Sequence, residues 1–364
     1  MNGTYLIAGG GTGGHLYPGI AIAEEIRRRA PGTRIVFAGR GLPLERDIVG
    51  RHGYELVAVS SGGVVGRSPV QRLRGAFLAL RGIGEAMGIL KRERPRAVVG
   101  VGGYASGPMV LAAALRRIPT LIEEQNAVPG LTNRLLGRVA REIALTFEET
   151  RRFFGGRGVV TGCPIRAEFM QADRDRARRR REAGGAPFNL LVFGGSQGAR
   201  ALNTAVLAAL PVLADRRARL AITHGTGSAD LERVKTGYAE AGWTADVRPY
   251  LTDIRAAYED ADLVVARAGA STVSELAACG RASIFVPLPT SAHDHQLKNA
   301  ERVAAASAAI VLEERDLDGA RLGGAIAALM DDPARLLRME RAAAGLARPD
   351  AAARIVDLLE RIAA

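Results

Sequence analysis

The feature that most constrains this chain is a strand, a glycine-rich turn and a helix that occur at the start and again near the middle. The apolar residues 5–8 run into the turn 9–14, and residues 189–193 run into the turn 194–199. A helical pattern follows each turn. Strands separated by helices predict a parallel sheet with helices on both faces. At 364 residues the chain is long enough to bury two such cores.

Further apolar stretches continue this alternation. We predict strands at residues 34–38, 97–101 and 120–123 in the first half and at 220–223, 263–266 and 283–286 in the second. The prediction is an α/β fold with two Rossmann-like, doubly wound domains that face a cleft. The arginine-rich segment 173–187 is interpreted as an interdomain or loop segment. Residues 351–363 are predicted to form a closing helix with one apolar face, made by Ile355, Leu358, Leu359 and Ile362.

Composition excludes several classes of protein. Hydrophobic residues are 48% and charged residues 24%, which is typical of a globular chain and not of a disordered or fibrous one. Cys163 and Cys279 are too few for a disulfide framework, and we expect both to be buried. The sequence shows neither a signal peptide nor an apolar run of the ~20 residues that a spanning helix needs. We therefore expect a cytoplasmic protein that is not integral to a membrane.

The net charge of +12 is concentrated in the first half. Residues 1–160 hold 23 basic and 12 acidic side chains, whereas residues 161–364 hold 27 and 26. Only three of the 50 basic residues are lysine, which codon bias could explain. Bias does not explain why acidic residues are few in one half only. We therefore expect the first half to meet an anionic partner: nucleic acid, phospholipid or a diphosphate substrate.

Residues 67–96 are the place where a lipid surface would be met. They carry eight basic and two acidic residues among many apolar ones. A core-facing amphipathic helix with a solvated basic face explains much of this pattern. We also expect an exposed apolar patch, ringed by arginines, that lies on anionic lipid. Its expected members are Leu73, Phe77 and Leu80 with Arg72, Arg74 and Arg81.

Four glycine-rich turns follow predicted strands, at residues 9–14, 102–107, 194–198 and 267–271. Free N–H groups and the helix dipole at such turns attract anions, so four of them predict a shared phosphate site. Gly9, Gly11 and Gly14 have the spacing of a dinucleotide fingerprint. The acidic residue expected at the end of the second strand is absent, which disfavours a nicotinamide or flavin cofactor. The sequence also lacks a P-loop pattern.

Three sets of polar residues have both a functional and a structural explanation. His15 begins a helix after the first turn, where its imidazole could take a proton from a hydroxyl; a structural role is the alternative. Glu275 could bind ribose hydroxyls, or it could close a capping box whose N-cap is Thr272. The Asp-x-Asp strings 173–175 and 260–262 could hold a metal, but we interpret them as solvated surface and predict no metal site.

Five motifs follow one another along the chain. They are Gly-Gly-Gly-Thr-Gly-Gly-His at 9–15, Gly-Gly-Tyr-Ala-Ser-Gly-Pro at 102–108, Glu-Gln-Asn at 124–126, Gly-Gly-Ser-Gln-Gly-Ala at 194–199 and Thr-Val-Ser-Glu at 272–275. Together, over nearly the whole chain, they resemble the MurG family of peptidoglycan N-acetylglucosaminyltransferases. The resemblance implies a GT-B fold without a cofactor. It also implies inverting transfer of GlcNAc from UDP-GlcNAc to the C4 hydroxyl of MurNAc in lipid I, which gives lipid II for the cell wall, cell shape and cell division.

The resemblance also implies where the substrates bind. Residues 1–165 would form an acceptor-binding, membrane-associating domain, residues 166–345 a UDP-GlcNAc-binding domain, and residues 346–364 a helix that returns to the first domain. His15 would be the catalytic base of a metal-independent reaction. The acceptor diphosphate would lie on Gly14, His15, Gly103, Tyr104 and Ser106. The donor would contact Thr12, Gly13, Gly14, Asn126, Arg166, Ser196, Leu251, Ala270, Ser271, Thr272, Val273, Ser274, Glu275 and Gln296.

The implied partners are UDP-GlcNAc, lipid I, the anionic cytoplasmic face of the membrane and other cell-wall synthesis and division proteins, but no nucleic acid. The chain departs from the family pattern at Glu123, Cys163, Ala268 and His295, without losing an essential charge. Other enzymes of this fold stay open as alternatives, such as a diacylglycerol glycosyltransferase or a UDP-GlcNAc 2-epimerase. A non-catalytic module that binds a nucleotide sugar or nucleic acid is another, although the basic half lacks the aromatic-rich strands of RNA-binding sheets.

Overall fold

The computed structural model describes residues 3–62, 69–195 and 197–364, which divide into two compact units. Unit 1 comprises Met1–Ala167 and Arg348–Ala364, and unit 2 comprises Glu168–Ala347. Each unit is built on a parallel sheet, so the predicted fold class is confirmed. The sequence placed Arg166 at the start of the second domain, but it belongs to unit 1.

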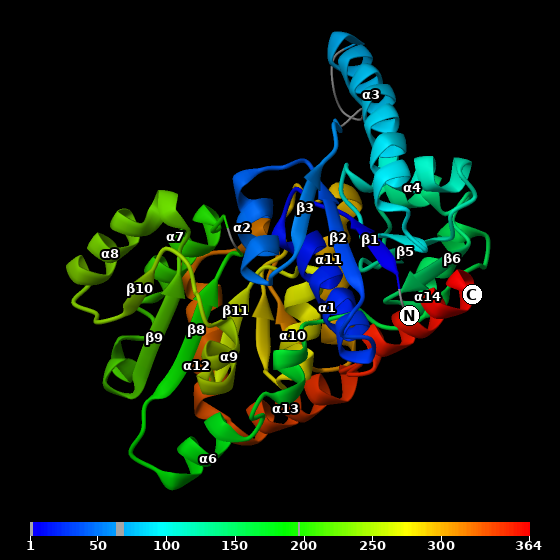
Figure 1. Ribbon diagram of the computed structural model, residues 1–364. Coiled ribbons are helices and arrows are strands. Elements are labelled where there is room, and N and C mark those ends of the chain that lie inside the picture. The colour runs from blue at the N-terminus through cyan, green and yellow to red at the C-terminus, as the bar shows by residue number, and fades with distance from the viewer. Residues whose placement is uncertain (1–2, 63–68, 196) are drawn as a thin grey trace. The chain divides into compact units, whose positions relative to one another are not determined.

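The sheet of unit 1 has the order β3-β2-β1-β4-β5-β6-β7 in the described residues (Figure 1). Its strands are β1 (Thr4–Ala8), β2 (Arg34–Gly39), β3 (Glu55–Ala58), β4 (Ala97–Gly100), β5 (Thr120–Glu124), β6 (Glu142–Leu145) and β7 (Val159–Val160). Its helices are α1 (Gly13–Arg29), α2 (Pro43–Arg51), α3 (Pro69–Glu93), α4 (Ser106–Leu115), α5 (Leu131–Leu136) and α14 (Ala351–Ala363).

Alternation along each strand of unit 1 builds two apolar layers, because successive side chains point to opposite faces. Ile7 belongs to the layer under α1, α2 and α14, whereas Leu6 belongs to the layer under α3 and α4. The closing helix has the predicted bounds, and its apolar face is buried, with Leu359 fully inaccessible. Arg29 of α1 also donates to Asp357 of α14 at 2.6 Å. The last helix is therefore an integral layer of unit 1.

The sheet of unit 2 has the order β10-β9-β8-β11-β12-β13 in the part of the chain that is described. Its strands are β8 (Phe188–Phe193), β9 (Leu220–Gly225), β10 (Asp246–Arg248), β11 (Leu263–Ala266), β12 (Ser283–Phe285) and β13 (Ala309–Val311). Its helices are α6 (Arg176–Ala183), α7 (Arg200–Ala209), α8 (Leu231–Glu240), α9 (Ile254–Asp260), α10 (Ala270–Ala278), α11 (His295–Ala305), α12 (Gly319–Asp331) and α13 (Pro333–Leu346).

Two interpretations of the charged residues of unit 2 were wrong. Much of the arginine-rich segment forms helix α6 inside unit 2, so it is not an interdomain segment. Asp262 is not solvated: it is fully buried and receives hydrogen bonds from both Arg180 and Arg181. Arg181 also donates to Glu340 of α13 at 2.8 Å. Arg180 and Arg181 hold α6 onto the unit through these ion pairs. Because the paired residues are far apart in sequence, the local pattern does not reveal them.

Two smaller expectations can also be compared with the structure. Cys163 and Cys279 are both buried, as predicted. None of the helices in the described residues is both long and apolar enough to cross a membrane.

Candidate active site

The predicted glycine-rich turns follow the central strands of each sheet. In unit 1 the sheet is built outward in one direction from β1 and in the other from β4. These two strands lie next to each other, with Ala8 of β1 beside Gly100 of β4. In unit 2 the sheet is built outward in the same way from β8 and β11, with Phe193 beside Ala266. Ligands of doubly wound sheets bind outside the carboxyl ends of the strands at this point. Each unit therefore brings two of the four turns together where a ligand is expected.

The first turn of unit 1 presents His15 at the start of α1. Thr12 is the N-cap residue, and its side chain makes no capping hydrogen bond. Instead, Thr12 Oγ1 lies 3.3 Å from Nδ1 of His15. The imidazole is half-buried, while Thr12 and Gly14 are exposed. The turn thus presents exposed residues at the start of the helix, where Thr12 lies against Nδ1 of the ring.

The second turn of unit 1 packs directly against the first. Gly102 has φ +92°, and a Cβ added there would lie 2.7 Å from Cδ2 of His15. Gly103 has φ +77°, and a Cβ there would lie 2.4 Å from the carbonyl oxygen of Gly10. Both positions need glycine for two reasons, because φ is positive and no space is left for a side chain. The two turns form one surface, with the imidazole resting on Gly102.

Ser106 and Tyr104, both predicted to bind the acceptor diphosphate, differ in accessibility. Ser106 is fully buried, and its hydroxyl lies 2.6 Å from the Ala8 carbonyl and 2.7 Å from the Gly102 carbonyl. Its side chain therefore ties the second turn to β1 and is not exposed to a ligand. Tyr104 is 49% exposed.

Glu45 is a residue of this site that the sequence analysis missed. It is fully buried, and its carboxylate accepts hydrogen bonds from the N–H of Gly11 at 2.7 Å and of Leu42 at 3.1 Å. A Cβ at Gly10 or Gly39 would lie within 3 Å of its oxygens. An internal carboxylate therefore occupies the inner side of the first turn. The only signal in the sequence is an acidic residue in the first turn of α2.

The end of β5 is joined to this surface through Gln125. Gln125 Nε2 donates to the carbonyl of Gly14 at 3.2 Å. Its neighbour Glu124 accepts from the backbone N–H of Asn126 at 2.9 Å and from Asn133 Nδ2 at 2.9 Å. Burial raises the pKa of Glu124 to about 7, against the effect of these hydrogen bonds. Asn126, a predicted donor contact, is thus fixed by a buried carboxyl group.

Arg166 lies near the end of the first segment of unit 1. Its guanidinium stacks over the Tyr17 ring of α1 at 4.2 Å, a cation–π contact. Its charge also lowers the pKa of Glu24, though less than the hydrogen bonds from His52 and Ala167, while burial opposes the shift. These contacts hold the arginine on α1, the helix that carries His15.

In unit 2 the structure rejects the capping-box explanation of Glu275. Helix α10 begins at Ala270 with Gly269 as its N-cap, so Thr272 lies inside the first turn and is not the cap. Glu275 is buried, and its Oε2 accepts a hydrogen bond from the Tyr258 hydroxyl at 3.3 Å. The predicted donor residues share this helix start: Ala270, Ser271, Thr272, Val273 and Ser274. The backbone N–H groups of Ala270, Ser271 and Thr272 lie in the first turn, where an anion is favoured, whereas that of Val273 donates to the Gly269 carbonyl at 2.9 Å.

The other glycine-rich turn of unit 2 is fixed by a buried polar network. Ser196, a predicted diphosphate contact, lies outside the described residues. Gly198 has φ +75°, and a Cβ there would lie 2.1 Å from the Thr226 carbonyl. That carbonyl accepts from Asn203 of α7 at 3.0 Å, and Asn203 also contacts His224 Nε2 at 3.1 Å. Burial lowers the pKa of His224 to about 4, so this imidazole is neutral at physiological pH.

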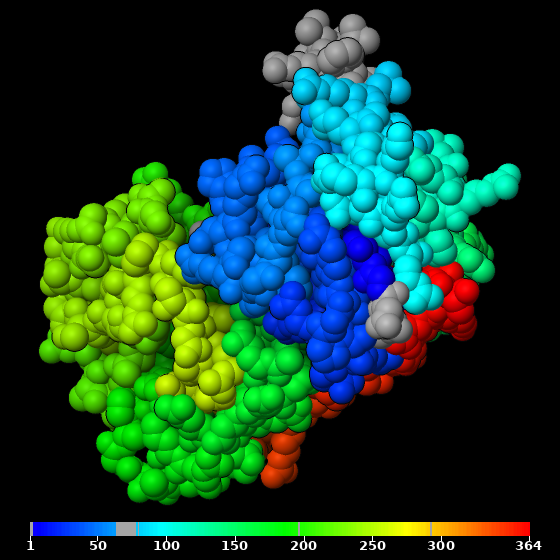
Figure 2. All heavy atoms as spheres, in the orientation of Figure 1, coloured from blue at the N-terminus to red at the C-terminus, as the bar shows by residue number. Residues whose placement is uncertain are grey.

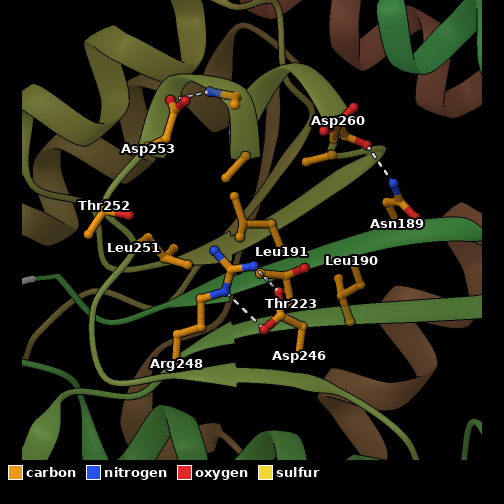
Figure 3. Close-up of a pocket in the computed structure, with 13 residues that line it drawn as sticks. Asn189, Leu190, Leu191, Thr223, Asp246, Arg248, Leu251, Thr252, Asp253 and Asp260 are labelled. Atoms are coloured by element: carbon orange, nitrogen blue, oxygen red, sulfur yellow. Dashed lines mark hydrogen bonds and ion pairs between the residues drawn. The ribbon is translucent and has the colours of Figure 1, made fainter.

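Leu251 and Gln296, the last two predicted donor contacts of unit 2, lie outside the glycine-rich turns and helix α10. Leu251 is buried against Gly225 and lines an open pocket of about 320 Å³ with Leu191 and Thr223 (Figure 3). The α10 residues do not line this pocket, so it does not collect the predicted donor contacts. Gln296, in the first turn of α11, accepts from the N–H of Leu288 through Oε1 at 3.0 Å, which fixes the orientation of its amide.

Acidic, histidine and cysteine side chains do not gather in groups of three or more that could hold a metal ion, as far as the chain is described. The first Asp-x-Asp string contains Asp173, which pairs with Arg179. In the second, Asp260 pairs with Arg176 at 2.8 Å, and Asp262 is the buried partner of α6. The carboxylates of both strings are therefore engaged by arginines.

Comparison with known proteins decides the family. Residues 5–145 match the glycosyltransferase family 28 N-terminal domain, and residues 189–355 match the family 28 C-terminal domain. The chain belongs to glycosyltransferase family 28. Within this family it is 49% identical, over 97% of its length and 91% of the relative's, to a protein of Anaeromyxobacter dehalogenans. That protein is named UDP-N-acetylglucosamine–N-acetylmuramyl-(pentapeptide) pyrophosphoryl-undecaprenol N-acetylglucosamine transferase.

Other family 28 relatives agree with the motif-based resemblance, which is thereby confirmed. A protein of Pelobacter propionicus with the same name is 45% identical over 97% of both chains. The crystal structure of Acinetobacter baumannii MurG matches with a TM-score of 0.79 at 32% identity, covering 99% of this chain and 100% of that one. A UDP-GlcNAc 2-epimerase of Neisseria meningitidis has a TM-score of 0.70 at 10% identity, which shows a shared fold alone.

Proposed function

We propose that the chain transfers N-acetylglucosamine from UDP-N-acetylglucosamine to the muramyl sugar of a pentapeptide-bearing undecaprenyl diphosphate, converting lipid I to lipid II. The observation that carries this proposal is the 49% identity, over 97% of the chain, to a transferase named for this reaction. The epimerase alternative has only a shared fold in its favour.

The reaction needs a base that takes the proton of the acceptor's C4 hydroxyl. That oxygen attacks the anomeric carbon of the donor while UDP departs, and an α-linked donor gives a β-linked product. His15 is the proposed base. For Nε2 to accept the proton, Nδ1 must carry the other one and donate it to Thr12 Oγ1, 3.3 Å away. Thr12 is therefore proposed to orient His15 and to select its tautomer, in addition to its predicted contact with the donor.

Unit 2 is proposed to bind the donor through the start of α10. Its backbone N–H groups would face the diphosphate, whose negative charge grows as UDP leaves. Glu275 has one oxygen engaged by Tyr258, and a carboxylate can accept further hydrogen bonds from the two ribose hydroxyls. Arg166 and Ser196 are proposed for the diphosphate, and Gln296 for the sugar.

The acceptor is proposed to be reached from a membrane surface, at its cytoplasmic face. Leu80 of α3 is 70% exposed, and the neighbouring Arg81 is exposed too. Helices α3 and α4 pack against each other in unit 1, and the described part of α3 (cyan) lies at the surface (Figure 2). Of the predicted patch, the side chains of Leu73, Phe77, Arg72 and Arg74 lie outside the described residues.

A second exposed apolar group adds support for lipid contact. Leu115 at the end of α4 is 64% exposed, and Leu135 of α5 is 52% exposed. Basic residues neighbour both in sequence: Arg116, Arg117, Arg134 and Arg138. Apolar side chains among arginines are the composition that anionic lipid attracts. Vesicle co-sedimentation that rises with anionic lipid content and falls with salt would support this part of the proposal.

The test of the proposed activity is a transfer assay with radiolabelled UDP-GlcNAc. A lipid I analogue and diacylglycerol are offered as competing acceptors, and the products are separated by chromatography. The expected result is label on the lipid I analogue alone. Label on diacylglycerol, or release of free N-acetylmannosamine without an acceptor, would replace the proposal by one of the alternatives.

A further inference from the structure

Unit 1 contains a polar pocket beside the turns described above. It is open and has a volume of about 450 Å³. It is lined by Arg40, Ala58, Val59, Ser60, Ser61, Leu78, Arg81 and Glu85. Arg40 and Ser60 follow β2 and β3, so the pocket lies at the carboxyl edge of the sheet, the edge that binds ligands in this fold.

Most polar groups of this pocket are already paired with one another. Glu85 of α3 accepts from the Ser60 N–H at 2.7 Å, from the Ser60 hydroxyl at 3.0 Å and from Arg81 Nε at 2.8 Å. These interactions, first among them the Ser60 backbone hydrogen bond, lower the pKa of Glu85 although burial opposes them. Glu85 is therefore ionised at neutral pH, and Arg81 balances its charge.

Two groups of the pocket are left unengaged. Arg40 is exposed, and within the described part of the chain no carboxylate pairs with it. Ser61 is only 8% exposed, and its hydroxyl is buried without a hydrogen-bond partner among the described residues. The Arg40 guanidinium can bind an oxyanion through two parallel hydrogen bonds. The Ser61 hydroxyl can donate a further hydrogen bond to the same oxyanion.

The pocket lies close to both turns proposed to hold the acceptor diphosphate. A Cβ at Gly82 of α3 would lie 2.0 Å from the Ser60 carbonyl and 3.1 Å from Pro108, which follows the second turn. On the other side, Gly39 touches Glu45, whose carboxylate binds the N–H of Gly11 in the first turn. One layer of residues therefore separates the pocket from each turn.

From this placement we infer that the Arg40 and Ser61 pocket binds a carboxylate of the peptide that the acceptor carries. The inference rests on the proposed function. The diphosphate has its own place, at the turns after β1 and β4, whereas the pocket follows β2 and β3, the next strands in the sheet. Neighbouring strands lie ~4.8 Å apart, so the two places are separated by roughly 5–10 Å, which the muramyl sugar and the start of its peptide can span.

The test compares two acceptor analogues in micelles without anionic lipid. One carries the pentapeptide, and the other carries an uncharged amide in place of the whole peptide. Acceptor KM is measured for the wild type, Arg40→Gln and Ser61→Ala. Arg51→Gln is the matched control, because Arg51 is an exposed arginine of α2 that does not line the pocket.

The expected result is a roughly tenfold higher KM of Arg40→Gln for the pentapeptide analogue, as when one charge-assisted hydrogen-bonding group is lost. Ser61→Ala should show a smaller rise. The KM for the uncharged analogue, and that of the control for both, should stay unchanged. An equal rise for both analogues, or none, overturns the inference, as does a rise that appears only when anionic lipid is added. If the wild type transfers to neither analogue, the proposed function itself fails.

Discussion

Gly102 should be indispensable because it supports His15. In Gly102→Ala the new Cβ would lie 2.7 Å from Cδ2 of His15, where ordinary contacts need 3.4–4 Å. The imidazole must therefore move by about 1 Å, and a misplacement of that size near the reacting atoms costs on the order of 10²-fold in rate. Alanine at φ +92° adds ~1–2 kcal/mol of backbone strain. We expect kcat to fall ~100-fold and the protein to stay folded.

The control for Gly102→Ala separates strain from displacement of the imidazole. Gly53→Ala has comparable strain, at φ +71°, but among the described residues the nearest atom to its new Cβ is Arg27 Nη1 at 4.0 Å. Urea unfolding should therefore show a loss of ~1–2 kcal/mol for both variants, while only Gly102→Ala loses kcat in the transfer assay. A Gly102→Ala enzyme with normal kcat, or a Gly53→Ala enzyme that is equally slow, would refute this account of how His15 is positioned.

Three further outcomes follow from the site. His15→Ala should lower kcat by roughly 10²–10⁴ with nearly unchanged UDP affinity in calorimetry; wild-type turnover would exclude His15 as the base. Glu275→Ala should raise donor KM at least tenfold, whereas Tyr258→Phe, which leaves the carboxylate in place, should change it little; a lower melting temperature of Glu275→Ala with unchanged donor KM would make Glu275 structural. The raised pKa of Glu124, about 7 against an ordinary 4.5, stabilises the fold at low pH. That contribution is complete below about pH 4.5 and is lost as pH rises to 7, up to about 3 kcal/mol. Glu124→Gln should flatten this fall in urea unfolding between pH 5 and 8, and an unchanged slope would contradict it.

Local pattern was sufficient to predict the glycine-rich turns and eight of the strands that the structure describes, but not β3, β6, β7, β10 and β13. Strand β11 and helix α14 have the predicted bounds, because a short continuous apolar run and a one-sided apolar face can both be recognised in consecutive residues. The turns at β1, β4, β8 and β11 were predicted for the same reason: each follows directly on a buried strand. The turns come together in pairs because β1 lies beside β4 and β8 lies beside β11. This strand order cannot be read from any single segment of the sequence.

What could not be predicted are the partners of polar residues far apart in sequence. Glu45 looks like an ordinary acidic residue of a helix start, yet it binds Gly11 in a different loop. Asp262 looks like surface until Arg180 and Arg181 are placed on it. Thr272 has the sequence of a cap, but the helix already begins at Ala270 because Gly269 takes the cap position. The first two cases depend on contacts between residues far apart in sequence, and the third depends on the residue at which the helix begins.

The measurement that tests the central claim most directly is the anomeric configuration of the product. Proton NMR of the disaccharide formed from α-linked UDP-GlcNAc and a lipid I analogue reports both the linkage and its stereochemistry. Direct attack by the C4 hydroxyl, with its proton taken by His15, predicts a β-1,4 linkage. An α-linked product, or a linkage to another hydroxyl, would contradict the account.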